Sequence, residues 1–261
     1  MSMRILEAAN ERALARLVRP ASKSDAAFER RVRRIVDRIR TGGDRELARL
    51  GRRYDGMVGP VEVSRTEIEA GARLIEPDVR RAIRQAARNV ARVAWRQVPK
   101  HFDLEVEPGV VVEQRVEPLA RVGCYVPGGR FPLPSSLLMT VIPARVAGVR
   151  EVVVACPRPE PAVLAAALDA GATRLLRIGG AHAIAALAYG TATIPRVDKI
   201  VGPGNRYVAA AKTLVAAECA IDFHAGPTEI VIVSGDGRPD WLAADLVAQA
   251  EHDPEIGRAH V

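Results

Sequence analysis

Two residues near the C-terminal end of the chain, Gln249 and His252, have side chains that bind metals. They lie three positions apart, so on a helix they share one face. A neutral imidazole is a good zinc ligand and an amide oxygen is a weaker one. Two ligands do not close a zinc site. The pair therefore indicates either part of a metal site completed from elsewhere or a polar helix end, where the helix dipole favours histidine.

Glycine-bearing turns are the second feature with chemical potential. Gly179-Gly180 and Gly202-Pro-Gly-Asn205 each stand between an expected strand and an expected helix. Glycine lets the backbone approach a ligand closely, and a helix N-terminus favours phosphate or carboxylate. The alternative is a tight turn capped by the asparagine. The chain contains neither GxGxxG nor GxxxxGK[ST], so the usual dinucleotide and phosphate-loop fingerprints are absent from the sequence.

The three cysteines are Cys124, Cys156 and Cys219. They are widely spaced and odd in number, which fits no disulfide framework and no CxxC metal pattern. Either they are nucleophiles or they are buried, inert thiols; the apolar neighbours of Cys124 and Cys156 favour the second interpretation. Reduced thiols are typical of a cytoplasmic protein.

Composition narrows the class of protein. Residues 1–100 hold 24 of the 38 basic residues but 13 of the 31 acidic ones. Basic and acidic residues alternate at helical spacing there, without an aromatic platform, so we expect a solvated helical surface rather than a nucleic-acid partner. The sequence contains no run of about 18 apolar residues, the length that would predict a membrane-spanning helix. Residues 1–20 are charged throughout, unlike a secretory signal, and we expect a cytoplasmic protein.

The elements that position these residues fall into two regions. Residues 1–105 are mainly helical by their three- and four-residue apolar spacing. Asp44 is the expected N-cap of one helix, and Thr66 that of another, in a capping box closed by Glu69. The expected helices cover 24–54, broken at 41–44, and 64–95, broken near Pro77.

Residues 106–255 form the second region, where strands alternate with helices. The Val-rich stretch 106–116 is a β segment, and a loop-rich stretch around 123–134 follows it. Strands alternating with helices of about ten residues predict βαβ units and a parallel sheet covered on both faces. The expected strands are 151–155, 174–178, 199–201 and 229–233, and the expected helices are 161–170, 181–189, 206–217 and 240–251.

Five motifs, taken together and in this order, resemble those of histidinol dehydrogenases. The last one leads with family-like spacing into Asp245 and then Gln249-Ala-Glu-His252. The resemblance is close from about Gly123 onward and weaker in the helical first region. The motifs are Gly123–Gly129, Pro132–Met139, Gly179–Gly190, Val197–Asn205 and Ile221–Glu229.

This resemblance implies an α/β fold with a helical N-terminal arm and a Rossmann-like, doubly wound parallel sheet of the aldehyde/histidinol dehydrogenase kind. It implies a zinc- and NAD-dependent homodimer that oxidises L-histidinol through the aldehyde to L-histidine. This chain departs from the family at position 182, commonly Gln, and at position 228, often Ser. The residues that match family site positions are Tyr125, His182 and Asn205 for NAD, Thr228, Gln249 and His252 for the substrate, and Gln249 and His252 for zinc.

The resemblance covers only the N-terminal part of a family member. The family's Glu-His general acid and base, and the Asp and His that complete its metal site, have no match here, so we expect this chain to lack catalytic residues and to be an inactive fragment. Residues 256–261 resemble a translated sequencing adapter, and we expect the native sequence to end near Glu255. Two alternatives stay open: a related zinc/NAD dehydrogenase of another small alcohol, such as a sulfonated diol, and a non-catalytic remnant that binds NAD or nucleic acid.

Overall fold

The computed structural model describes residues 26–128, 132–223, 230 and 232–252, with side chains up to residue 248. The chain divides into two compact units, one of residues 27–224 and one of residues 1–26 with 225–261. The described part of the second unit consists of Ile230, residues 232–238 and helix α9 (Pro239–His252). No helix within the described ranges is long and apolar enough to span a membrane.

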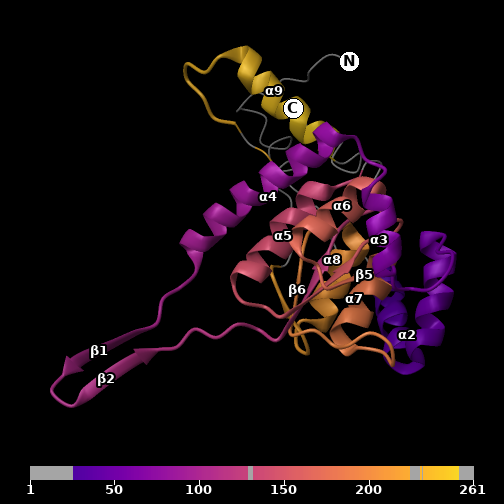
Figure 1. The fold of residues 1–261 in the computed structure, drawn as a ribbon, viewed down its shortest axis with the longest axis horizontal. Helices are drawn as coiled ribbons and strands as arrows, with labels where there is room; N and C mark the ends of the chain where they lie inside the picture. Colours follow the sequence, from indigo (N-terminus) through magenta and orange to yellow (C-terminus); the bar gives the residue numbers. More distant parts are fainter. Residues whose placement is uncertain (1–25, 129–131, 224–229, 231, 253–261) are drawn as a thin grey trace, which may run out of the picture. The chain divides into compact units, whose positions relative to one another are not determined.

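A five-stranded parallel sheet organises the first unit (Figure 1). Its spatial order is β5-β4-β3-β6-β7, so β3 is central and the chain winds outward from it in both directions. This confirms the expected doubly wound α/β fold. The strands are β3 (Arg121–Tyr125), β4 (Glu151–Ala155), β5 (Arg174–Leu176), β6 (Lys199–Val201) and β7 (Ala220–Ile221).

Helices cover both faces of the sheet, as buried parallel strands require. Alternate residues of β4 enter two separate cores: Val153 and Ala155 pack with α2, α7 and α8, while Val152 and Val154 pack with α3, α5 and α6. The helices are α2 (Ala26–Leu50), α3 (Arg65–Ala72), α4 (Pro77–Gln97), α5 (Pro134–Val146), α6 (Pro161–Ala170), α7 (Gly180–Tyr189) and α8 (Arg206–Val215).

The N-terminal helices belong to these same two cores, through α2 in one and α3 and α4 in the other. The expected boundary at residue 105 stays a prediction. Helix α2 is interrupted where a break was expected, at Gly43, whose φ of 51° interrupts the helical backbone. Asp44 does not cap the following turns: its carboxylate instead accepts hydrogen bonds from the backbone N–H and hydroxyl of Thr193.

Two further expectations need correction. Helix α3 is capped by Ser64, whose hydroxyl accepts from the Glu67 N–H, and not by Thr66. The strand expected at 229–233 is wrong for its described residues: Ile230, Ile232 and Val233 are outside any strand. A strand needs a neighbouring backbone to pair with, and within the described residues the sheet ends at β7.

The Val-rich segment forms an antiparallel hairpin instead of one strand. Strands β1 (Phe102–Glu107) and β2 (Val110–Gln114) are joined at Pro108-Gly109, and Gly109 has a φ of 82°. Every residue of both strands is exposed. In Figure 1 the hairpin follows α4 and lies away from the sheet.

Candidate cofactor-binding site

The carboxyl ends of β3 and β6 meet at the reversal of strand order. β3 ends at Tyr125 and pairs with β4 on one side and β6 on the other. The chain continues from β4 to β5 in one direction and from β6 to β7 in the other. In open α/β sheets, ligands bind in the crevice outside the strand ends at such a reversal. The topology therefore places a ligand crevice beside Tyr125.

The turn after β6 runs against β3. Gly202 has a φ of 113°, and a Cβ there would overlap the carbonyl oxygen of Tyr125. Asn205 caps α8: its side-chain oxygen accepts from the N–H groups of Tyr207 and Val208, at 3.0 and 3.3 Å. Because the oxygen is the capping atom and the residue is exposed, the NH2 group of Asn205 is the donor that it can offer to a ligand.

The turn before α7 is held by two side chains from other segments. The Gly179 N–H donates to Oδ2 of Asp55 at 3.0 Å, and the Gly180 N–H donates to the Tyr125 hydroxyl at 3.0 Å. Asp55 ends the short π-helix η1 (Gly51–Asp55). Two N–H groups at the start of α7, which has no side-chain cap of its own, are thereby satisfied.

His182 is buried in the first turn of α7, with 2% of its surface exposed. Its Nε2 lies 2.7 Å from Oδ2 of Asp55, which is itself 9% exposed. A carboxylate oxygen accepts hydrogen bonds, so the imidazole donates to Asp55 through Nε2–H. The other ring nitrogen, Nδ1, takes no part in this contact. The imidazole is fixed by Asp55, and the expected contact of His182 with NAD stays a prediction.

Tyr125 is also buried, and its hydroxyl is the group that meets the α7 turn. Burial raises the pKa of Tyr125 from its usual 10 to about 12, despite the opposing hydrogen bond from Gly180. The side chain is therefore a neutral phenol at physiological pH. It accepts from the Gly180 N–H and keeps its own O–H to donate.

A buried ion pair between Lys212 and Asp222 holds the turn after β6. Neither these two residues nor Asp55 was identified from the sequence. For Asp222 the available signal was its place in the motif Ile221–Glu229. For Asp55 there was none, since its partners Gly179 and His182 are remote in the chain.

The remaining expected site residues stay predictions. Thr228 lies outside the described residues. Gln249 and His252 belong to α9, in the second unit, and their side chains lie outside the described set. Among the described side chains, no group of three or more His, Cys, Asp or Glu could hold a metal ion. Two ligands alone do not build a zinc site.

The three thiols are free and buried, which confirms the expectation of inert cysteines. Burial raises the pKa of Cys124 and of Cys156 to about 12, and that of Cys219 to about 11. The thiolate is the nucleophilic form, so none of them is suited to covalent catalysis at neutral pH.

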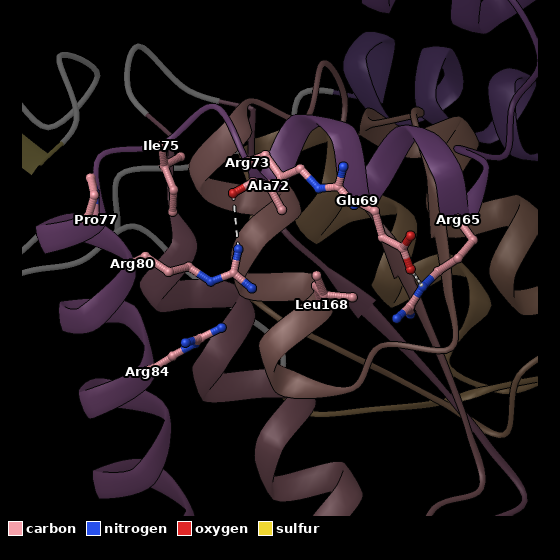
Figure 2. Close-up of a pocket in the computed structure, with 9 residues that line it drawn as sticks. All are labelled: Arg65, Glu69, Ala72, Arg73, Ile75, Pro77, Arg80, Arg84 and Leu168. Carbon is pink, nitrogen blue, oxygen red and sulfur yellow. Dashed lines mark hydrogen bonds and ion pairs between the residues drawn. The ribbon is translucent and has the colours of Figure 1, made fainter.

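A hollow of about 480 Å³ lies between α3, α4 and α6 (Figure 2). Arg80 joins the three helices: it bonds Asp169 of α6 at 2.7 Å and the Ala72 carbonyl at 3.1 Å. None of its lining residues belongs to the turns after β3, β5 or β6. They are Arg65, Glu69, Ala72, Arg73, Ile75, Pro77, Arg80, Arg84 and Leu168.

Comparison with known proteins agrees with this arrangement. The family model for histidinol dehydrogenase matches residues 18–259. The chain is 51% identical over 250 residues to the histidinol dehydrogenase of Thermus thermophilus, covering 95% of this chain and 60% of that protein. It is 49% identical over 228 residues to that of Methanothermobacter thermautotrophicus, covering 85% of this chain and 54% of that protein.

A solved structure shows the same fold. The crystal structure of histidinol dehydrogenase from Elizabethkingia anophelis superposes with a TM-score of 0.84 at 33% identity, covering 93% of this chain and 58% of that one. The chain thus spans somewhat more than half the length of the relatives it matches. On the extent of the family match and the level of identity, the chain belongs to the histidinol dehydrogenase family of oxidoreductases.

Proposed function

We propose that this chain forms the NAD-binding part of an enzyme that oxidises L-histidinol through its aldehyde to L-histidine, the last step of histidine biosynthesis. One observation carries the proposal: Tyr125, the turn that leads into His182, and Asn205 all lie at the carboxyl ends of β3, β5 and β6, beside the reversal of strand order. These are the positions that match the family's NAD contacts.

The crevice suits a dinucleotide. Gly202 keeps the turn after β6 close to β3, where a side chain would not fit, and the N-termini of α7 and α8 favour a pyrophosphate. When bound, NAD supplies the hydride acceptor. The Tyr125 hydroxyl and the Asn205 NH2 group offer donors at the edge of the crevice. For His182, Nδ1 is the atom proposed to meet the cofactor, since Nε2 is bonded to Asp55.

We propose substrate contacts at Thr228, Gln249 and His252, and zinc ligation by Gln249 and His252. The support is the motif match together with helix α9, which places the last two residues three positions apart on one helix. Proton transfer is assigned by the resemblance to a Glu-His pair that these 261 residues do not match. Without a base to take the hydroxyl proton, these 261 residues alone do not catalyse the oxidation of L-histidinol.

The first test is a calorimetric titration of the 261-residue chain with NAD, alongside an assay for NADH formation from L-histidinol with zinc present. We expect NAD to bind and no NADH to form. Absence of NAD binding by the folded chain would contradict the proposed cofactor role. Steady NADH production would contradict the assignment of proton transfer to residues outside this chain.

We also propose that the protein acts as a cytoplasmic homodimer. An isolated two-stranded hairpin is marginally stable in water, yet β1 and β2 expose Leu104, Val106 and Val112 by 54, 51 and 48%, and Leu104 and Val112 lie opposite each other on one face. A second copy that covers these side chains would stabilise the hairpin. Sedimentation equilibrium of the chain and of Val112→Lys tests this: weaker self-association of the variant supports the proposal, and monomers in both samples oppose it.

A further inference from the structure

Lys212 is a buried cation in the middle of α8. It is 4% exposed and lies among the apolar residues Val208, Ala211 and Val215 of the same helix. Its Nζ donates to Oδ1 of Asp222 at 2.7 Å and to the carbonyl oxygen of Gly202 at 2.6 Å. Burying an ammonium is costly unless it is paired and hydrogen-bonded, and here both conditions are met.

Asp222 links the same turn to the chain that follows β7. Its Oδ2 accepts from the Gly202 N–H at 2.8 Å, and its Oδ1 accepts from the Phe223 N–H at 2.9 Å. Burial disfavours the charged carboxylate, but the hydrogen bonds from Lys212, Gly202 and Phe223 outweigh it and lower the pKa of Asp222. The Asp222 carboxylate is therefore ionised at neutral pH.

Both polar backbone groups of Gly202 are thus held by one ion pair. Gly202 begins the turn that carries Asn205 and packs against the carbonyl of Tyr125. Any displacement of the Lys212–Asp222 pair would therefore move this turn.

We propose that Lys212 and Asp222 are positioning residues that hold the turn carrying Asn205 in place against β3. This inference rests on the proposed function, in which Asn205 contacts NAD. Neither side chain is required to touch a ligand. The pair acts through the two backbone groups of Gly202.

A purely stabilising role makes a different prediction from a positioning role. Lys212→Met leaves the partly buried Asp222 carboxylate without its cation, which is destabilising. The double variant Lys212→Met with Asp222→Asn leaves no unpaired charge, so most of the thermal stability returns. In that double variant the Gly202 carbonyl still has no ammonium donor, so the turn is not restored.

The experiment compares the 261-residue chain with Asp222→Asn, Lys212→Met, the double variant and the control Asp169→Asn, which weakens the Arg80–Asp169 pair between α4 and α6. Each protein is measured by thermal unfolding, by NAD titration and by hydrogen exchange at the Gly202 amide. We expect the double variant to unfold near the wild-type temperature but to bind NAD about tenfold more weakly. The control should bind NAD as the wild type does.

The outcomes separate this inference from the proposed function. If the wild type binds NAD and the double variant binds it equally well, the positioning role is overturned while the NAD-binding role stands. If the folded wild type does not bind NAD, the proposed function fails, and hydrogen exchange then tests the positioning role by itself. Faster exchange of the Gly202 amide in the folded double variant supports that role. Unchanged exchange overturns it.

Discussion

The Nε2 atom of His182 lies 2.7 Å from Oδ2 of Asp55, and both side chains are buried. The same carboxylate oxygen accepts the N–H of Gly179. A residue on the short helix after α2 thereby fixes both the turn that enters α7 and the ring at the position where the family commonly has Gln. The consequences of this pair can be measured without any ligand.

Asp55→Ala should lower the free energy of unfolding by about 2–4 kcal/mol, because it leaves a buried imidazole N–H and a backbone N–H without an acceptor. Urea denaturation followed by far-UV circular dichroism measures the change. Asp37→Ala is the matched control, since Asp37 is exposed and a surface change of this kind stays within about 0.5 kcal/mol. Equal effects of the two substitutions would contradict a structural role for the Asp55–His182 pair.

Gly202→Ala should destabilise the chain severely, by about 3 kcal/mol or more, or prevent folding. The added Cβ overlaps the Tyr125 carbonyl, and the φ of 113° is strained for any L side chain. Gly235→Ala is the control, because a Cβ there meets nothing within 4 Å. Soluble yield and unfolding temperature provide the comparison. A wild-type unfolding temperature for Gly202→Ala would refute the close approach of Gly202 to the Tyr125 carbonyl.

Asp222 predicts an acid-sensitive contribution to stability. The pKa of Asp222 in the folded chain is lowered below the ordinary 3.8. At pH values between the folded and the unfolded pKa, the unfolded chain therefore binds more protons than the folded one. The contribution is present above the unfolded value and is lost as the pH falls through the folded one. Urea denaturation between pH 3 and pH 6 should show that the free energy of unfolding falls less steeply with decreasing pH in Asp222→Asn than in the wild type. Equal slopes would argue against a paired carboxylate.

The three thiols should resist labelling. A folded chain at pH 8 treated with a thiol-specific disulfide reagent should react slowly at Cys124, Cys156 and Cys219, since burial keeps their pKa values at about 11 to 12. In denaturant all three should react at once. Rapid reaction of one thiol in the native chain would identify an opening of the structure at that site, which is inconsistent with its buried position.

The sequence predicted the strands and helices whose patterns are local. Strand β4, helix α6 and strand β6 have the predicted bounds. Strand β3 was missed, because its residues from Gly123 on were assigned to a loop-rich stretch, and helix α5 was not predicted. β3 is short and contains Gly123, while α5 starts at Pro134, includes Pro143 and is apolar along its length, so neither shows a clear period of 2 or 3.6.

The site was predictable in part for the same reason. Tyr125, the Gly179 turn and Asn205 are parts of contiguous motifs, and they follow β3, β5 and β6 of the same parallel sheet. Asp55 and Lys212 act through partners that are distant in sequence or on another element. A buried charge and its partner leave no periodic pattern, so those contacts required the three-dimensional structure.

The central position of β3 determines how this unit can be completed during synthesis. β3 emerges from the ribosome before both of its neighbours, and its partner β6 follows only after β4, α6, β5 and α7 have been made. Until then β3 is an unpaired edge strand on the side that β6 will occupy, and α8 does not yet cover the apolar face of α7. Such non-local pairing slows folding and exposes the nascent chain to aggregation. Chaperone demand during translation should therefore be greatest between the emergence of β3 and that of β6.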